Sequence, residues 1–261
     1  MKSIPGIRHL LRLTRNKIYI FLFWQELLKQ LIPYDVKGFG EKIRLGNQGD
    51  GGYVLPKEII PFIDVLYTYG VGNDISFEKD MITYKDIPVR FYDHTVIGLP
   101  EKNEKFIFKR EGIAGSKYGS FDTFENHLQE HGDKKRKILL KMDIEGSEWE
   151  TLAPIIDGFH RNIVAIVVEI HGLDEVKKFP RQIEVLNRIN SKFTMVHIHG
   201  NNYSGVAHFG KKSIPATCEL TFINNKLIKQ KKVMITPLPF KHDYPNLSGR
   251  DDIPLDFWLK G

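Results

Sequence analysis

Three apolar stretches of this sequence each end beside a side chain that can bind a metal ion or move a proton. Asp143 follows ILLKM, Glu169 lies one residue before the end of IVAIVVEI, and His199 ends FTMVHIH. Two carboxylates and one imidazole suit an octahedral divalent ion such as Mg²⁺, Mn²⁺ or Fe²⁺, with water or substrate hydroxyls as the remaining ligands. We therefore predict a metal site formed by Asp143, Glu169 and His199.

The spacing of these residues supports a shared site, because they lie 26 and 30 residues apart, about one strand–helix unit each. A bound ion lowers the pKa of a hydroxyl, and His171 or His197 could then act as general base. The predicted catalytic residues are thus Asp143, His171, His197 and His199. Plainer roles stay open: Asp143 could cap the next helix, and a histidine near a strand end is usually structural.

The elements that must position these residues recur at regular intervals. Each predicted strand is followed by a predicted helix or turn, which indicates a doubly wound α/β sheet whose carboxyl edge binds ligands. The predicted parallel strands are Val65–Tyr69, Val89–Tyr92, Phe106–Lys109, Ile138–Asp143, Ile163–Ile170 and Phe193–His199. After them, Thr217–Asn224 and Lys232–Ile235 are predicted to pair as a terminal antiparallel β-hairpin.

A glycine turn follows the first of these strands and precedes a predicted helix. Gly70 and Gly72 in this turn would let a nucleotide cofactor approach the backbone. Asp93 and His94 end the second strand, where an acid can accept hydrogen bonds from the ribose hydroxyls of an adenosine-containing cofactor. Ile75 stands where G-x-G-x-x-G requires its third glycine, so the turn by itself is weak evidence.

Two further segments are predicted to border this cofactor. Small residues around Ile113 and Ala114 suit a loop that lies beside a flat base. Upstream, KIRLGNQGDGGYVLP carries Asp50 and Tyr53 among four glycines that permit close backbone approach to a ligand. A β-hairpin with an Asp-Gly turn is the alternative for this second segment.

Composition is that of a soluble globular protein: 261 residues, 41% hydrophobic and 27% charged, with a net charge of +6. The positive charge favours anionic partners. However, the basic residues are dispersed without an aromatic-and-basic stripe, so no nucleic-acid partner is expected. Cys218 is the only cysteine, which excludes an intrachain disulfide and favours a reducing, cytoplasmic location.

The N-terminal segment is basic and contains the apolar run IYIFLFW. A membrane-spanning helix needs about 20 apolar residues, so this run is too short, and no signal-peptide cleavage site follows it. Residues 1–35 are predicted to be helical and to pack on the domain, with contact to the inner face of a membrane as the alternative. We divide the chain into a helical extension (1–40), a cofactor-binding domain (41–237) and a tail (238–261) that could cover the site as a substrate lid.

The stretch KMDIEGSEWETL resembles the K-x-D-x-E-G-x-E motif of the FkbM-type S-adenosylmethionine-dependent methyltransferases. DGGYV and YTYGVGNDISFE are also similar to that family, and the resemblance spans roughly Lys42–Ile223. It implies a class I methyltransferase (Rossmann-like) fold, with a seven-strand sheet whose last strand is antiparallel. The GVGN turn departs from the fuller glycine-rich loop of many methyltransferases.

This resemblance implies S-adenosylmethionine as cofactor, with Gly70 and Gly72 near its methionine part, Asp93 on the ribose, and Ile113 and Ala114 beside adenine. Members of the family often methylate hydroxyls of sugars or natural products. We therefore predict an O-methyltransferase that acts on a sugar, either nucleotide-linked or a surface-glycan precursor of the capsule type.

Two alternatives are an NAD-dependent oxidoreductase and a non-catalytic membrane-associated binding protein. The missing third glycine and the terminal hairpin disfavour the oxidoreductase. The binding protein would leave Asp143, Glu169 and His199 without a role. The sequence is compatible with a homo-oligomer.

Overall fold

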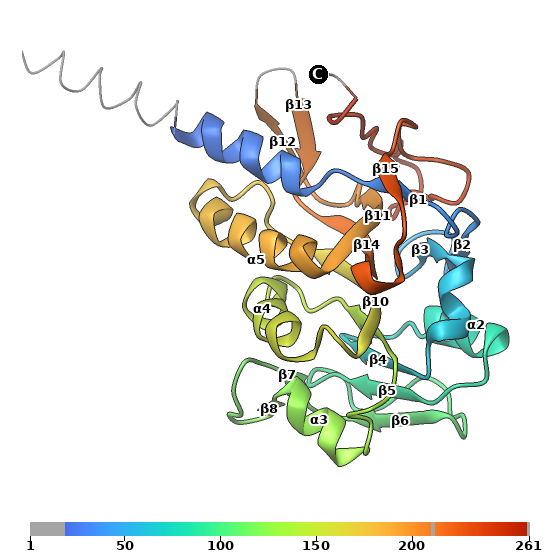
Figure 1. Ribbon diagram of the computed structural model, residues 1–261. Helices are drawn as coiled ribbons and strands as arrows, with labels where there is room; N and C mark the ends of the chain where they lie inside the picture. The colour runs from blue at the N-terminus through green and yellow to red at the C-terminus, as the bar shows by residue number, and fades with distance from the viewer. Residues whose placement is uncertain (1–18, 210–211, 260–261) are drawn as a thin grey trace, which may run out of the picture.

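The computed structural model describes residues 19–209 and 212–259, and a seven-stranded sheet forms its centre (Figure 1). The strand order is β6–β5–β4–β9–β10–β14–β11, in which β14 runs antiparallel to both of its neighbours. The strands of this sheet are β4 (Val65–Tyr69), β5 (Val89–Tyr92), β6 (Phe106–Lys109), β9 (Ile138–Met142), β10 (Ile163–Ile170), β11 (Phe193–Gly200) and β14 (Cys218–Asn224). The predicted α/β class with an antiparallel seventh strand is confirmed.

The terminal hairpin was predicted with the wrong partner strand. β14 does not pair with the residues that follow it; it is inserted between β10 and β11. All its residues are buried, so its backbone can be bonded on both edges, whereas β15 (Lys231–Val233) is exposed throughout. β15 instead pairs with β1 (Tyr34–Val36), after a turn through η3 (Asn225–Leu227). The antiparallel pair at the end of the sheet is therefore β11 with β14, and the small hairpin β12 (Val206–Phe209) and β13 (Lys212–Pro215) lies between them in the chain.

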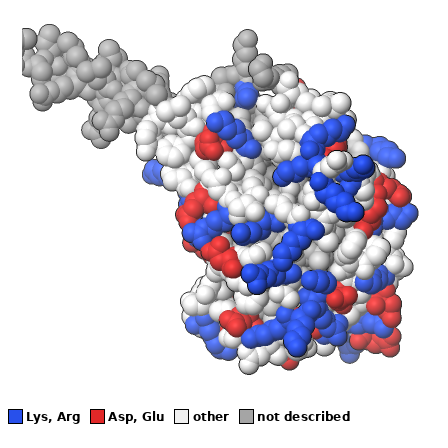
Figure 2. Space-filling model, viewed as in Figure 1, with Lys and Arg blue, Asp and Glu red and all other residues white. Residues whose placement is uncertain are grey.

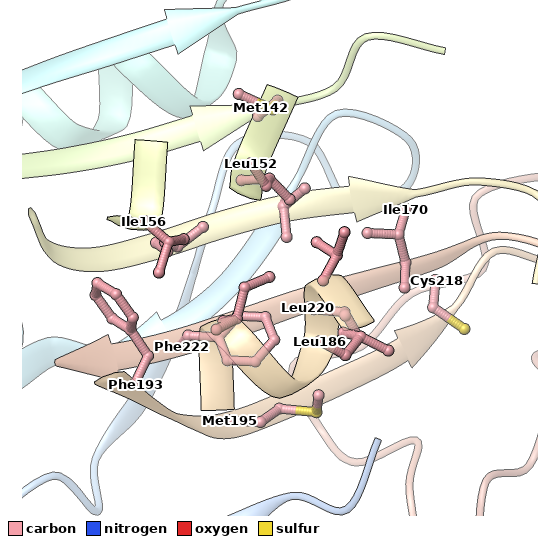
Figure 3. Packing of buried hydrophobic residues seen from close by; sticks show 14 of the residues in the cluster. Met142, Leu152, Ile156, Ile170, Leu186, Phe193, Met195, Cys218, Leu220 and Phe222 are labelled. Carbon is pink, nitrogen blue, oxygen red and sulfur yellow. The ribbon is translucent and has the colours of Figure 1, made fainter. Parts of the chain in front are cut away.

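Helices cover both faces of the sheet because its strands carry buried apolar residues on both sides. On one face α4 (Glu148–Phe159), α5 (Phe179–Lys192) and α3 (Phe124–Glu130) pack on the strands. Figure 3 shows Leu152 and Ile156 of α4 and Leu186 of α5 beside residues of β10, β11 and β14. The other face is covered by α2 (Ser76–Tyr84), η1 (Lys57–Phe62) and the hairpin β2 (Lys42–Leu45) and β3 (Tyr53–Pro56).

The described part of the N-terminal segment is a helix over residues 19–30 that packs on the domain, as predicted. Trp24, Leu27 and Leu31 are buried, and the Asn190 side chain of α5 donates to the Gln30 carbonyl at 2.9 Å. The helix is shorter at its C-terminal end than the predicted 1–35, because β1 begins directly after Pro33. The rest of the predicted helix, residues 1–18, lies outside the described residues. Within the described part, no helix is both long and apolar enough to cross a membrane.

The surface charges are mixed on the face that Figure 2 shows. Lys and Arg side chains are spread over several elements and interspersed with Asp and Glu and with uncharged surface. The remaining described elements are short: β7 (Gly112–Ile113), β8 (Phe121–Asp122) and η2 (Val176–Lys178). β8 precedes α3 in the chain, and η2 leads directly into α5.

Candidate active site

A cavity of about 470 Å³ opens at the carboxyl ends of β4, β5 and β9. The turn after β4 lines it, and Gly70 lies there with φ +79°. A Cβ on Gly70 would stand 1.6 Å from the carbonyl oxygen of Asp143, so only glycine lets this turn pack against the end of β9. Gly72, in the same turn, also lines the cavity and also has a positive φ, of 54°.

Asp93 connects the end of β5 to this glycine turn. Its Oδ2 accepts hydrogen bonds from the backbone N–H of Val71 (2.8 Å) and Gly72 (3.0 Å), and its Oδ1 accepts from the N–H and hydroxyl of Thr95. Burial alone would raise the pKa of Asp93, but these hydrogen bonds outweigh it and hold the pKa at about 2. Asp93 is therefore an anion that orders the turn. Its predicted contact with a cofactor ribose stays a prediction.

An aromatic recess forms the part of the cavity beyond Asp93. The His94 and Phe121 rings lie 4.6 Å apart between centroids, and Ile113 joins them in the lining. A Cβ on Gly112 would collide with the Phe121 ring at 2.5 Å, so the glycine keeps the recess open to that ring. Sequence reasoning missed Phe121, because only the pairing of β7 with β8 brings it beside Gly112.

Ala114 corrects one expectation about this recess. It does not line the cavity, and its N–H is bonded to the Asp122 carbonyl, which continues the pairing of the strands β7 and β8. The predicted small-residue loop therefore contributes Gly112 and Ile113 to the cavity, and the flat surface is provided by His94 and Phe121.

Tyr53 and Asp143 form the opposite end of the cavity. The Tyr53 hydroxyl donates to Asp143 Oδ2 at 3.3 Å, and the Lys141 ammonium lies 5.3 Å from the centre of the Tyr53 ring. Burial raises the pKa of Asp143 to about 6, against the opposing charges of Lys141 and His171. Asp143 Oδ1 is buried without a hydrogen-bond partner among the described residues. Ser147 is the N-cap of α4 and no side chain caps that helix, so the alternative role of Asp143 as a helix cap is excluded.

His171 forms a cluster with Asp143 and Glu145, both of which line the cavity, although His171 itself is not among the lining residues. Ligand atoms of these three side chains lie within 4.8 Å of one another, and no other group of three or more such residues was found in the described parts of the chain. Nε2 of His171 is 3.5 Å from Glu145 Oε2 and 3.7 Å from Glu169 Oε1. Burial by itself lowers the pKa of His171, but the hydrogen bond with Glu148 and the nearby carboxylates raise it overall.

His199 does not join this cluster, which corrects the predicted metal site. The insertion of β14 places Glu219 between Glu169 of β10 and His199 of β11 in the strand register. His199 Nδ1 lies 3.1 Å from Glu219 Oε2, and Nε2 lies 3.0 Å from Asp252 Oδ1. Burial opposes the charged form, but these two hydrogen bonds raise the pKa of His199 to about 10. Both nitrogens are engaged, so neither is free for a metal.

Glu169 stands beside the cluster as a buried carboxylate. Burial, followed by the charges of Asp143 and Glu219, raises its pKa well above the ordinary value. Its Oε1 accepts a hydrogen bond from Asn201 at 2.9 Å. Glu169 therefore lies near His171 but is not a member of the cluster of Asp143, Glu145 and His171.

His197 is also excluded as a base, because it contacts the C-terminal tail and not the cavity. Its Nε2 lies 2.8 Å from Asp243 Oδ1, and burial lowers its pKa.

Asn246 attaches the tail to the domain, in addition to the contacts of Asp243 with His197 and of Asp252 with His199. Its side-chain amide donates to Glu219 at 2.6 Å and to Asp50 at 3.3 Å. Asp50 lines the cavity, so the tail reaches its rim; a role as a substrate lid stays a prediction.

The fold and the cavity define the class of protein. The sheet order with an antiparallel seventh strand, and a cavity behind a glycine turn and an acid at adjacent strand ends, are those of a class I methyltransferase. The profile of the methyltransferase FkbM domain matches residues 49–197, more than half of the 261 residues. The chain belongs to the FkbM methyltransferase family. This membership favours a methyltransferase over an NAD-dependent oxidoreductase and over a non-catalytic binding protein.

Other comparisons add little. A search among curated proteins finds no significant match. Among solved structures, the precorrin-6y C5,15-methyltransferase from Geobacter metallireducens GS-15 is similar at 10% identity with a TM-score of 0.32, over 64% of this chain and 85% of that chain. A likeness at this level carries no weight for function.

Proposed function

We propose that this protein transfers a methyl group from S-adenosylmethionine to a hydroxyl oxygen of a sugar. The observation that carries the proposal is the cluster of Asp143, Glu145 and His171, in which the two carboxylates line the cavity and the imidazole lies against them. The adenine would lie against His94 and Phe121, and the cofactor's sulfonium would point toward Asp143. A sulfonium cation is stabilised by a nearby carboxylate.

The transfer itself is an in-line displacement. The acceptor oxygen attacks the methyl carbon, the carbon–sulfur bond breaks, and sulfur leaves as the neutral thioether of S-adenosylhomocysteine. The hydroxyl proton goes to His171 Nε2, the one imidazole nitrogen of the three predicted histidines that faces the cluster. Positioning of the two reactants supplies much of the acceleration.

A divalent cation fits the same end of the cavity. Two carboxylates and an imidazole within 4.8 Å of one another suit Mg²⁺, Mn²⁺ or Fe²⁺, and the buried Asp143 Oδ1 lacks a partner among the described residues. Asp143, Glu145 and His171 would hold the ion, which would lower the pKa of a bound hydroxyl. His171 would then be a ligand and not the base, so activity after chelation separates the two arrangements.

The charge of this end favours an acceptor without negative groups near its reacting hydroxyl. Asp50, Asp143 and Glu145 line the cavity at this end, where Lys141 is the basic side chain in the lining. A phosphate held among these carboxylates would be repelled. We therefore propose a neutral sugar of a glycan precursor as acceptor, with any nucleotide carrier held outside this end.

Calorimetry with S-adenosylmethionine, followed by methyl transfer from labelled cofactor to a panel of neutral glycosides and nucleotide-sugars, tests the proposal. We expect saturable cofactor binding and labelled product from at least one neutral glycoside. Absence of cofactor binding would refute the proposed activity. Transfer only to an amine, or only to acceptors with phosphate next to the reacting hydroxyl, would refute the proposed acceptor.

A further inference from the structure

Glu148, the last acid of the KMDIEGSE stretch, has no role in the scheme above, yet it is completely buried at the start of α4. Its Oε1 accepts hydrogen bonds from the backbone N–H of Ile144 (3.0 Å) and Gly146 (3.2 Å). The same oxygen lies 3.2 Å from Nδ1 of His171. One buried carboxylate oxygen thus joins the turn after β9 to the histidine after β10.

The bonds to Ile144 and Gly146 flank a strained residue. Glu145 has φ 55° and is the non-glycine residue with a positive φ in the described chain. This conformation is unfavourable for an L-residue, and it persists only where the surroundings enforce it. Because Glu148 accepts from the backbone N–H of the residue before Glu145 and of the residue after it, it holds the turn in this form, in which the Glu145 carboxylate lies 3.5 Å from His171.

The bond to His171 selects the tautomer of the imidazole. An ionised carboxylate only accepts hydrogen bonds, so Nδ1 carries the hydrogen that points at Glu148. In the neutral ring Nε2 is then unprotonated, and this is the nitrogen near Glu145 and Glu169. Trp149, the next residue of α4, also fastens His171, because its indole N–H donates to the His171 carbonyl at 2.7 Å.

We propose that Glu148 is a positioning residue that orients both Glu145 and His171 toward the reacting hydroxyl. The inference rests on the proposed function of the site. Its effect is the same whether His171 accepts the proton or binds a cation, since both require an unprotonated Nε2 with a fixed ring. Carboxylates that orient a catalytic or metal-bound histidine through its other nitrogen act in this way, and their loss typically costs 10- to 100-fold.

The tautomer can be measured without any acceptor. Long-range ¹H–¹⁵N spectra of the full chain at pH 8.5, with the His171 signals assigned by their loss in His171→Gln, should show hydrogen on Nδ1 and none on Nε2. In Glu148→Gln the Nε2–H form should gain population. A wild-type ring with hydrogen on Nε2 overturns the proposal. These spectra succeed or fail independently of the proposed methyl transfer.

Steady-state kinetics provide a second test of the role of Glu148. With an active acceptor, Glu148→Gln should lower kcat at least tenfold, while the Kd for S-adenosylmethionine changes less than twofold. Glu150→Gln is the matched control, because Glu150 lies one position beyond Trp149 in α4, its side chain is 76% exposed, and Arg181 is its ion-pair partner among the described residues; it should keep full activity. In a His171→Ala background, Glu148→Gln should cost clearly less than in the wild-type background, because the part of its effect that acts through His171 is already lost. A full tenfold loss in that background, or full activity of Glu148→Gln, overturns the proposal.

Discussion

The two ends of the cavity are built in different ways. One end, which we call the cofactor end because we propose that S-adenosylmethionine binds there, contains Asp93. This side chain is bound to Val71, Gly72 and Thr95, all within 22 residues of it, and its pKa is lowered to about 2. At the cluster end, Tyr53 meets Asp143 across 90 residues of sequence, and burial raises the pKa of Asp143 to about 6. One end is a local, fully bonded anion site. The other gathers carboxylates from distant segments and keeps them poorly partnered, as a binding or catalytic site requires.

The largest effect on stability and on cofactor binding is expected at Gly70, in the turn of the cofactor end. Gly70→Ala places a Cβ in the Asp143 carbonyl and in an unfavourable φ, so it should lower the free energy of unfolding by about 3 kcal/mol or more. Cofactor binding should become undetectable by calorimetry. Gly98→Ala, at a glycine with ordinary φ and open space around it, should be neutral. Normal binding by Gly70→Ala would show that the turn does not meet the cofactor.

The cluster end should lose catalysis and not binding when His171 is removed. His171→Ala should reduce kcat by about 10²- to 10⁴-fold, the usual contribution of a positioned proton acceptor, with the Kd for S-adenosylmethionine nearly unchanged. His199→Ala should instead leave kcat nearly unchanged and destabilise the protein. It removes the imidazole between the carboxylates of Glu219 and Asp252, which costs about 3 kcal/mol or more of unfolding free energy. Equal kcat losses in both variants would contradict the assignment of His199 to the tail.

The attachment of the tail should depend on pH through His199. Its pKa is raised from 6.5 to about 10 in the folded protein, so its contribution to stability is complete below about pH 6.5 and is lost as the pH rises toward 10. Limited proteolysis should therefore cut residues 238–255 faster at pH 10 than at pH 7. The cutting rate of His199→Ala should be high at both pH values. A wild-type rate that does not change with pH would argue against this anchor.

The smallest effect is expected at Asn246. Asn246→Ala removes the bonds to Glu219 and Asp50, worth about 1–3 kcal/mol together with the desolvated groups they satisfy. KM for the acceptor should rise a few-fold, while kcat and the cofactor Kd should stay within twofold. Ile97→Ala, at a residue 89% exposed, is the neutral control. A changed cofactor Kd would place the tail at the cofactor and not at the acceptor.

Sequence reasoning reached the cofactor end because its signals are local. Gly70, Gly72 and Asp93 stand at the ends of strands that their apolar pattern reveals, and all of them line the cavity. It reached Asp143 and His171 in the same way. It missed Phe121 and Glu148, and it gave Glu145 no place in the metal site, because the partners of these residues are set by strand pairing and by the turn after β9.

By itself, the sequence determined the six parallel strands, the glycine turn after β4 and the acids that end β5 and β9, since apolar periodicity and glycine spacing act over a few residues. Only the tertiary structure decided the order of the strands beyond β10 and the side-chain contacts that follow from this order. The spacing of Glu169 and His199 predicted neighbouring strands, but β14 lies between β10 and β11. His199 therefore bonds to Glu219 of β14 and to Asp252 of the tail and does not belong to the cluster. Strand order is a choice among distant pairings that share similar local patterns, and it is settled by which pairing buries both faces and satisfies every backbone group.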